Sequence, residues 1–169
     1  MRPFAEGDLD GYTAILQSEP VRAALHLPDT IGPFDAWSQM AAWLGQWELR
    51  GTGQWALEEK ATGSLVGRAG LHHPARDDWP GVEVGWALHP GCWGRGYATE
   101  AGRRAIDFAF GDLHLDRVCS VILPENARSI AVARRLGFRL GEERVLSHAP
   151  SMPHGIWWLP REDWPAAGA

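Results

Sequence analysis

The chain has 169 residues, of which 45% are hydrophobic and 22% charged, and its formal net charge at pH 7 is -5. This composition is that of a soluble globular protein with its own core, so we expect a single domain over residues 1–169. An acidic chain without a run of about 20 apolar residues argues against a nucleic-acid partner and against a membrane span.

The cysteines and the N-terminus indicate the compartment. Cys92 and Cys119 have no metal-ligand spacing and form no disulfide framework, so we expect no metal and a reducing, cytoplasmic location. The opening residues, MRPFAEGDLD, contain no apolar stretch of the kind that a secretory signal requires.

The first part of the chain predicts two helices and a hairpin. Apolar residues at helical spacing favour helices over 7–18 and 34–50. In the second helix, five residues at steps of three and four are predicted to face the core: Trp37, Met40, Ala41, Leu44 and Trp47. Two strand-like runs around the sequence ATG then predict a β-hairpin across 53–73.

From residue 82 onward, strands and helices alternate. The run VEVGWALH, residues 82–89, predicts a strand, and a helix over about 97–110 follows. That helix has a face of mostly small residues: Ala101, Ala105, Phe108 and Ala109. A strand RVCSVIL, a helix NARSIAVARRL that ends at Gly137, and a strand GIWWL complete the chain. This order predicts an α/β sandwich with a mixed sheet.

Charge is distributed unevenly along the chain. Residues 1–94 carry six basic and twelve acidic side chains (net -6), residues 95–139 eight and five (+3), and residues 140–169 two and four (-2). Such a distribution suits a middle segment that binds an anion and a first segment that receives a cation. Chance variation of the surface explains it equally well.

Residues 91–101, GCWGRGYATEA, place three glycines just before the predicted helix. A glycine-rich turn between a strand and a helix directs backbone N–H groups and the positive end of the helix dipole toward one point, which favours a phosphate. Two common phosphate loops are excluded. A P-loop needs Lys and then Ser or Thr after its last glycine, whereas Tyr97 follows Gly96. A dinucleotide fingerprint would need glycine at Thr99.

The same stretch resembles the acyl-CoA pyrophosphate loop of the GNAT N-acetyltransferases, whose pattern is Q/R-x-x-G-x-G/A. Gly96 and Ala98 match, and Trp93 stands where Gln or Arg is commonest, which is similar to the RimJ/RimL-like branch. Further blocks resemble the family in the same order: RPFAEGDLDGY, GVEVGWALHP, PENARSIAVARRLGF and WWLPREDW. The resemblance implies a three-layer α/β sandwich, with a mixed, mostly antiparallel sheet of six to seven strands flanked by helices.

The resemblance also implies acetyl-CoA as cosubstrate and a role for each matched residue. The pyrophosphate would be held by the backbone amides of Trp93, Gly94, Arg95, Gly96, Tyr97 and Ala98, with the Arg95 side chain near the phosphates. Asn126 would bind the pantetheine arm, and Ser129 would lie near the thioester sulfur. The fourth and fifth strands diverge in this family, and there the amides of Trp86, Ala87 and Leu88 would face the thioester carbonyl.

Local structure offers a second interpretation of several residues. Asn126 is also a good N-cap for a helix over 127–136, in which Ser129 is the third residue. Glu100, in the first turn of its helix, is predicted to be structural because the helix dipole favours a carboxylate there. Cys92 has no matched histidine partner, so we do not expect a covalent acyl-enzyme.

Acetyl transfer to an amine requires a base, because an amine with a pKa near ~10 is protonated at neutral pH and only the free amine attacks a thioester. Strand alternation puts Glu83 on one face with Gly85 and Ala87, whose small size leaves room for a ligand beside the carboxylate. We therefore predict Glu83 as the base, with a solvent-facing glutamate as the alternative. His72 and His73 are rival bases, since histidine titrates in the right range.

One position departs from the family pattern. Many GNAT enzymes carry a tyrosine four residues before the glycine of the GF pair, where it protonates the leaving thiolate, but Ala133 stands there in this chain. Ser129, the second predicted catalytic residue, or a water would then help, or no acid is needed because a thiolate with a pKa near ~8.5 leaves readily. A non-catalytic acyl-CoA-binding module is therefore the alternative function.

The expected acceptor is a primary amine, either a protein N-terminus or a small molecule, since the RimJ/RimL-like branch includes enzymes of both kinds. We expect its pocket between the first two helices and the late loop SHAPSMPHG, residues 147–155. Trp37, Trp157 and Trp158 either line this pocket or belong to the core. A homodimer is left open, and a nucleotide-binding domain of another class is the third alternative.

Overall fold

The computed structural model describes residues 1–147 and 149–165. The chain forms two compact units: unit 1 is Met1–Gly70 with Trp86–Ala101, and unit 2 is Leu71–Gly85 with Gly102–Ala169. Over the described residues there are five α-helices and an open sheet of six strands in the order β1-β2-β3-β4-β6-β5. β1 with β2, β4 with β6 and β5 with β6 pair antiparallel, and β3 with β4 pairs in parallel, which confirms the predicted fold class. The single domain over 1–169 stays a prediction.

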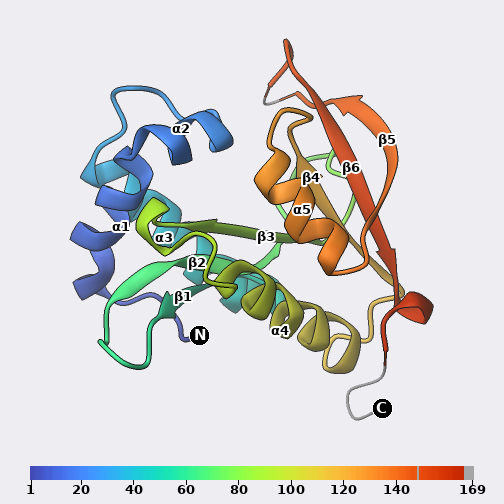
Figure 1. Ribbon diagram of the computed structural model, residues 1–169, viewed down its shortest axis with the longest axis horizontal. Coiled ribbons are helices and arrows are strands. Elements are labelled where there is room, and N and C mark those ends of the chain that lie inside the picture. The colour runs from blue at the N-terminus through green and yellow to red at the C-terminus, as the bar shows by residue number, and fades with distance from the viewer. Residues whose placement is uncertain (148, 166–169) are drawn as a thin grey trace. The chain divides into compact units, whose positions relative to one another are not determined.

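Unit 1 contains three helices and a β-hairpin (Figure 1). Its elements are α1 (Leu9–Gln17), α2 (Glu19–Leu25), α3 (Pro33–Arg50), β1 (Gln54–Glu58) and most of β2 (Leu65–His72), whose last two residues belong to unit 2. The two strands pair antiparallel, as predicted. α1, α3 and β1 contribute to one buried cluster, on which Leu25 of α2 packs: Phe4, Tyr12, Leu16, Ile31, Ala36, Met40, Trp43 and Ala56. Burial of these apolar side chains is the main force that holds the helices on the hairpin.

The buried face of α3 differs from the predicted one. Ala36, Met40 and Trp43 are buried at positions i, i+4 and i+7. The exposed members of the predicted stripe are Trp37, at 48% exposure, Leu44, at 41%, and Ala41. Two overlapping stripes of this helix have helical spacing, and the one with the small Ala36 packs into the cluster that contains Tyr12. Apart from Met40 and the half-buried Trp47, the predicted core stripe was therefore wrong.

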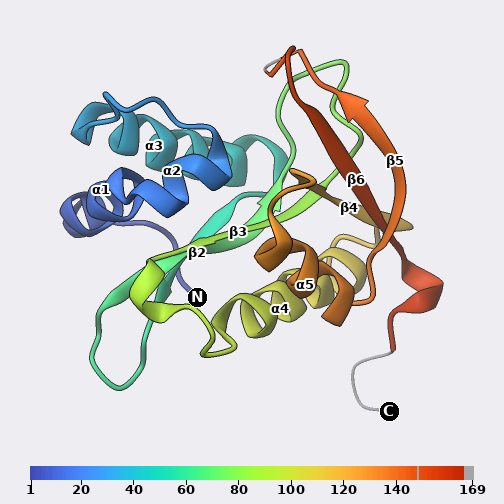
Figure 2. The ribbon, with the colours of Figure 1, turned by 45° about the horizontal axis from the view of Figure 1, so that its top comes forward.

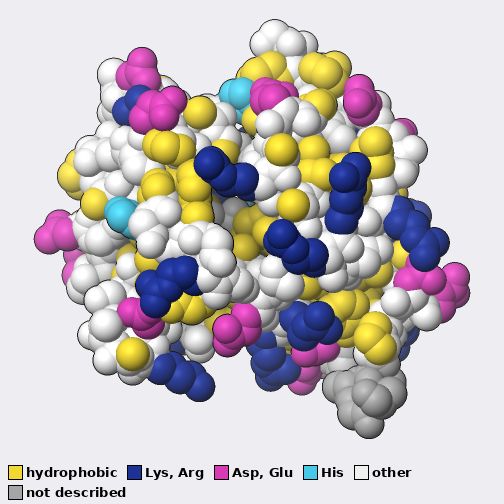
Figure 3. Space-filling view, in the orientation of Figure 1, with side chains coloured by type: hydrophobic (Ala, Val, Ile, Leu, Met, Phe, Trp, Pro, Cys, Tyr) yellow, Lys and Arg dark blue, Asp and Glu magenta, His cyan; other side chains and the backbone are white. Residues whose placement is uncertain are grey.

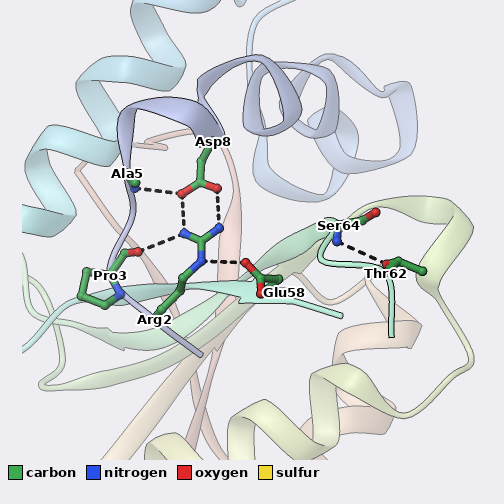
Figure 4. Close-up of polar contacts among 7 residues, drawn as sticks. All are labelled: Arg2, Pro3, Ala5, Asp8, Glu58, Thr62 and Ser64. Atoms are coloured by element: carbon green, nitrogen blue, oxygen red, sulfur yellow. Dashed lines mark hydrogen bonds and ion pairs between the residues drawn. The ribbon is translucent and has the colours of Figure 1, made fainter. Parts of the chain in front are cut away.

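Charged side chains attach the N-terminus of unit 1 to β1 (Figure 4). Arg2 donates two hydrogen bonds of 2.7 Å to the Asp8 carboxylate and one of 2.9 Å to Glu58. Asp8 also accepts from the Ala5 amide at 2.8 Å. Hydrogen bonding from the Arg2 side chain is the main cause that lowers the pKa of Asp8, and the bond from the Ala5 amide adds to it. The segment before α1 is thereby held against the hairpin.

Unit 2 contains β4 (Arg117–Ile122), α5 (Ala127–Arg135), β5 (Arg139–Val145) and β6 (Pro153–Pro160) (Figure 2). β3 (Glu83–Leu88) and α4 (Tyr97–Gly111) each have residues in both units. β4 pairs with β6 along its whole length, from Arg117↔Pro160 to Ile122↔Gly155. The predicted small face of α4 is confirmed by the burial of Ala101, Ala105 and Ala109, with Phe108 half-buried.

Two elements have no counterpart among those predicted from the sequence. The short α2 begins after Ser18 and has a proline in its first turn, where the missing N–H costs no helical hydrogen bond. β5, with the sequence RLGEERV, is almost entirely exposed and is the edge strand beside β6. β5 is held by backbone pairing with β6. Because this pairing does not depend on a buried face, the sequence of β5 shows no hydrophobic alternation that would predict a strand. The strand also contains an irregular register near Gly141, where a Cβ would lie 2.7 Å from Trp158.

Candidate functional site

The predicted anion loop follows β3 in unit 1. The amide of His89, the first residue after the strand, donates to the Val66 carbonyl of β2 at 2.9 Å. A short 3-10 turn then leads to Trp93, whose indole N–H donates to the Leu88 carbonyl at 2.9 Å. The entrance of the loop is thus bonded to both β2 and β3.

Gly94 and Gly96 have positive φ angles of 76° and 87°. A Cβ at either position would meet nothing within 4 Å, so the backbone conformation, and not lack of space, requires glycine. Within the described residues, the amides of Gly94, Arg95 and Gly96 donate to no protein acceptor. The loop therefore offers backbone donors next to the positive end of α4, which fits the pyrophosphate of the implied cosubstrate.

Arg95 and Tyr97, on either side of Gly96, share a partner that sequence reasoning missed. Glu59, in the turn after β1, accepts at Oε1 from Arg95 Nη2 at 2.6 Å and from the Tyr97 hydroxyl. The Arg95 guanidinium lies 5.0 Å from the centroid of the Tyr97 ring. The hydrogen bond from Tyr97 is the main cause that lowers the pKa of Glu59, and it raises the pKa of Tyr97. No local pattern signals this contact, because 36 residues separate Glu59 from Arg95.

Trp86, Ala87 and Leu88 form the end of β3 in unit 1. Ala87 and Leu88 are buried, and the half-buried Trp86 packs on the cluster to which Leu88 belongs. Gly67 on β2 permits the close approach of the two strands, since a Cβ there would lie 2.3 Å from the Ala87 carbonyl oxygen. The structure thus explains these residues by packing, and their role toward a thioester stays a prediction.

In unit 2, β3 pairs in parallel with β4 at a single register position, Glu83↔Cys119. The Cys119 amide donates to the Val82 carbonyl at 2.9 Å, whereas the Val121 amide lies 3.4 Å from Oε1 of Glu83. A side-chain carboxylate therefore accepts from β4 where the backbone pairing ends. Burial, and secondarily the charge of Glu83, raise the pKa of the Cys119 thiol, so this thiol is neutral at physiological pH. The role of Glu83 as a base stays a prediction.

Of the rival bases, His72 is the last residue of β2 and His73 follows it; both are half-buried. The His72 ring stands edge-on to Trp79, with ring centroids 5.4 Å apart. The following loop is held by Asp78, which accepts from the Ser147 amide at 2.5 Å, and this bond lowers the pKa of Asp78. Both histidines belong to unit 2, as Glu83 does, so all three candidates stay open.

Asn126 is the N-cap of α5, as its local interpretation predicts. Its Oδ1 accepts from the Ser129 amide at 3.1 Å. Among the described residues, the side-chain NH2 group of Asn126 has no acceptor, so it is available to a ligand. Ser129 is half-buried in the first turn of the helix. The contacts of Asn126 and Ser129 with a cofactor stay predictions.

Basic side chains of unit 2 gather over α5 and the adjacent part of α4 (Figure 3). The exposed arginines on these helices are Arg103, Arg104, Arg128, Arg134 and Arg135. They account for most of the basic residues in the segment 95–139, which the sequence predicts to suit an anion.

The three tryptophans considered for an acceptor pocket have different surroundings. Trp37 is exposed on α3 beside Phe34, with ring centroids 6.2 Å apart. Trp157 is buried and lines a hollow of about 500 Å³ that α5, β5 and β6 of unit 2 surround. Trp158 is half-buried, with the Arg117 guanidinium 4.3 Å from its ring centroid. In the predicted late loop, His148 lies outside the described residues.

The described residues contain neither a cluster of metal-ligating side chains nor a helix that could span a membrane. In residues 1–147 and 149–165, no group of three or more His, Cys, Asp or Glu side chains is arranged to hold a metal ion. No helix in the described part of the chain is both long and apolar enough to cross a membrane. Cys92 and Cys119 are both free thiols.

The sequence matches a family model described as an acetyltransferase (GNAT) domain over residues 1–139. One curated relative, "Uncharacterized N-acetyltransferase YoaA" of Bacillus subtilis, is 26% identical over 136 residues, which are 80% of this chain and 70% of YoaA. With other curated relatives from this organism, the match spans about half of the relative's length.

Solved structures of acetyltransferases share the fold. An acetyltransferase from Agrobacterium tumefaciens is 28% identical and superposes with a TM-score of 0.79, covering 95% of this chain and 89% of its own. The ribosomal-protein-S5-alanine acetyltransferase of Vibrio fischeri is 19% identical, with a TM-score of 0.74 over 97% of this chain and 93% of its own. At that identity, the second likeness shows the fold alone.

Proposed function

Because the chain belongs to the acetyltransferase (GNAT) domain family, we propose that it moves the acetyl group of acetyl-CoA to a primary amine by direct attack in a ternary complex. The observation that carries the proposal is the loop of Gly94 and Gly96, with its positive φ angles and its backbone donors free of protein acceptors. Bound acetyl-CoA supplies an acyl group activated as a thioester. The residues of the chain bind it, orient it and move protons.

Binding is assigned to backbone donors first. The amides from Trp93 to Ala98 would hold the pyrophosphate, since converging N–H groups at a helix start favour an anion. Asn126 would donate its free NH2 group to the pantetheine arm while its oxygen continues to cap α5. The amides of Gly94, Arg95 and Gly96 and the side-chain NH2 group of Asn126 have no acceptor among the described residues, whereas the Trp93 amide donates to the Pro90 carbonyl at 3.1 Å.

Proton removal from the amine is assigned to Glu83, with His72 and His73 as rivals. The carboxylate of Glu83 is half-buried at the point where β3 stops pairing with β4, and it accepts from the Val121 amide at 3.4 Å. A carboxylate can accept the proton of an ammonium group.

The leaving thiolate has no tyrosine acid at the matched position, because Ala133 stands there and is fully buried. Ser129 is the remaining side chain proposed to donate to the sulfur. A neutral hydroxyl contributes modestly, about 0.5–1.5 kcal/mol for a hydrogen bond of this kind. The proposal therefore assigns most of the rate to positioning and to the base.

We propose a positively charged amine as acceptor, in line with the net charge of -6 over residues 1–94. The RimJ/RimL-like motif and the fold likeness to a ribosomal-protein-S5-alanine acetyltransferase make a protein N-terminus one candidate, and a small amine is the other. A cytoplasmic location and a homodimer belong to the same proposal.

The test has two stages. Calorimetric titration of the purified chain with acetyl-CoA, ATP and NAD should show binding of acetyl-CoA only. Release of free CoA thiol is then followed with a panel of peptides and small amines, and we expect release only when an acceptor is present. Tight acetyl-CoA binding without turnover on any acceptor would indicate the non-catalytic module. Binding of ATP or NAD in place of acetyl-CoA would contradict the proposal.

A further inference from the structure

The turn between β1 and β2 is a rigid support for one carboxylate. The Glu59 amide donates to the Ser64 carbonyl at 2.9 Å, and the Glu59 carbonyl accepts from the Gly63 amide at 2.9 Å. The Thr62 hydroxyl donates to Oε2 of Glu59 at 2.9 Å. Backbone and side chain of Glu59 are therefore both held by the turn in which it lies.

The other carboxylate oxygen of Glu59 holds the glycine loop. Oε1 accepts from Arg95 at 2.6 Å and from the Tyr97 hydroxyl. These two residues flank Gly96, and the guanidinium of Arg95 also lies over the Tyr97 ring. All of these groups belong to unit 1. One oxygen atom thus fixes the side chains on both sides of the second glycine.

Other contacts hold the two ends of the loop: the Trp93 indole donates to the Leu88 carbonyl at 2.9 Å, and the Gly96 carbonyl accepts from the Glu100 amide at 3.0 Å. Between these ends, no atom lies within 4 Å of the place where a Cβ would stand on Gly94 or Gly96, so neither glycine has a neighbour on that side. Glycine loses more conformational freedom on ordering than any other residue, and a ligand that has to order such a loop binds more weakly. A contact that orders the loop before the ligand arrives removes that cost from binding.

We propose that Glu59 is a positioning residue that pre-orders the Gly94–Gly96 loop for the anionic part of the cosubstrate, an inference that rests on the proposed function. Its negative charge opposes an incoming pyrophosphate and neutralises Arg95, so simple attraction does not explain its place. The Glu59 side chain is only 15% exposed, and its ion pair with Arg95 already offsets its charge, whereas the ordering of the loop has no such offset. Positioning therefore outweighs repulsion.

The test compares three variants by calorimetry and steady-state kinetics. Glu59→Ala removes the acceptor of both loop side chains and should weaken acetyl-CoA binding about tenfold, seen in both Kd and KM, with kcat within about twofold. Glu59→Gln keeps an oxygen acceptor and should stay within about threefold of the wild type. Glu58→Ala is the matched control, because it removes an equal charge from the preceding residue, which pairs with Arg2 instead.

A ligand-free measurement separates this inference from the proposed function. The 15N heteronuclear NOE of residues 94–96 should fall in Glu59→Ala and stay at its wild-type value in Glu58→Ala. An unchanged NOE, an unchanged Kd in Glu59→Ala, equal losses in Glu59→Ala and Glu59→Gln, or tighter binding in both would overturn the positioning role. If the wild type binds no acetyl-CoA while the NOE falls as expected, the proposed function fails, and with it the assignment of Glu59 to this cosubstrate.

Discussion

The chain uses its backbone donors differently just before α4 and at the start of α5. At α5, Asn126 caps the helix and its oxygen accepts from the Ser129 amide. Before α4, Gly96 has no side chain, and the amides of Gly94, Arg95 and Gly96 have no acceptor among the described residues. A helix start that caps itself is complete without a ligand, whereas one that lacks a cap keeps its donors for an anion. The comparison ranks the loop above Asn126 as a cofactor contact.

The largest effect on acetyl-CoA affinity is expected for Gly96→Val, which disrupts the uncapped loop before α4. Valine disfavours the φ of 87° at this position, and the loop would lose its donor arrangement. Since hydrogen bonds to charged groups contribute about 1.5–3 kcal/mol each, acetyl-CoA affinity should fall by ~100-fold or more. Calorimetric titration measures this loss.

Gly51→Val is the matched control for that substitution. Gly51 also has a positive φ, of 64°, and open space around it, but it ends α3. Gly51→Val should lower the melting temperature of the protein without changing its affinity for acetyl-CoA. Unchanged affinity in Gly96→Val would refute the loop assignment.

Glu83→Gln extends the comparison to β4, where the Val121 amide donates to the Glu83 side chain. If Glu83 is the base, kcat should fall ~100-fold or more near neutral pH, with acetyl-CoA affinity little changed. Glutamine keeps the oxygen that faces the Val121 amide, so the fold should be preserved. Steady-state rates of Glu83→Gln, His72→Ala and His73→Ala decide among the three candidates. A normal rate in Glu83→Gln with a loss in either histidine variant would identify that histidine as the base.

Asn126→Ser separates the two roles of Asn126, which are the capping of α5 and the proposed contact with the cofactor. Serine is also a good N-cap but lacks the free NH2 group, so stability should be kept while acetyl-CoA affinity falls about three- to tenfold. Asn126→Ala should in addition lose about 1 kcal/mol of stability, because it removes the cap. Denaturant unfolding and calorimetry measure the two effects. Wild-type affinity in Asn126→Ser would leave Asn126 with the capping role alone.

The smallest effect is expected for Ser129→Ala. One weak hydrogen bond from a hydroxyl to the sulfur corresponds to a roughly three- to tenfold slower acetyl transfer. The amide that Asn126 caps belongs to the backbone and is unaffected, so α5 should stay intact. Single-turnover rates with saturating acetyl-CoA test this. A loss of several orders of magnitude with fold and affinity preserved would make Ser129 a principal catalytic group.

Patterns that act between residues close together in the sequence were predictable. The small-residue face of α4, the hairpin of β1 and β2, and the end of α5 before Gly137 all follow from spacing and turn residues. The need for glycine before α4 was predictable as well, because a positive φ is a property of the backbone at one residue. Asn126 as an N-cap belongs to the same class, since the capping bond spans three residues.

Choices between equivalent local patterns were not predictable. On α3, the stripe with Trp37 and the stripe with Ala36 have similar spacing, and the tight packing near Tyr12 selected the smaller residue. β5 forms a strand because its backbone pairs with that of β6, although the residues of β5 are mostly charged and exposed.

By itself, the sequence determined a mixed α/β fold, a glycine loop suited to an anion, and the absence of a tyrosine at Ala133, because each of these depends on residue identity and short-range spacing. Tertiary structure decided which partner holds that loop, which face of α3 is buried, and where β3 and β4 stop pairing. Glu59 reaches Arg95 across 36 residues, and Glu83 reaches Val121 across 38. Contacts at such separation depend on how whole elements pack, and one sequence carries no periodic signal for them.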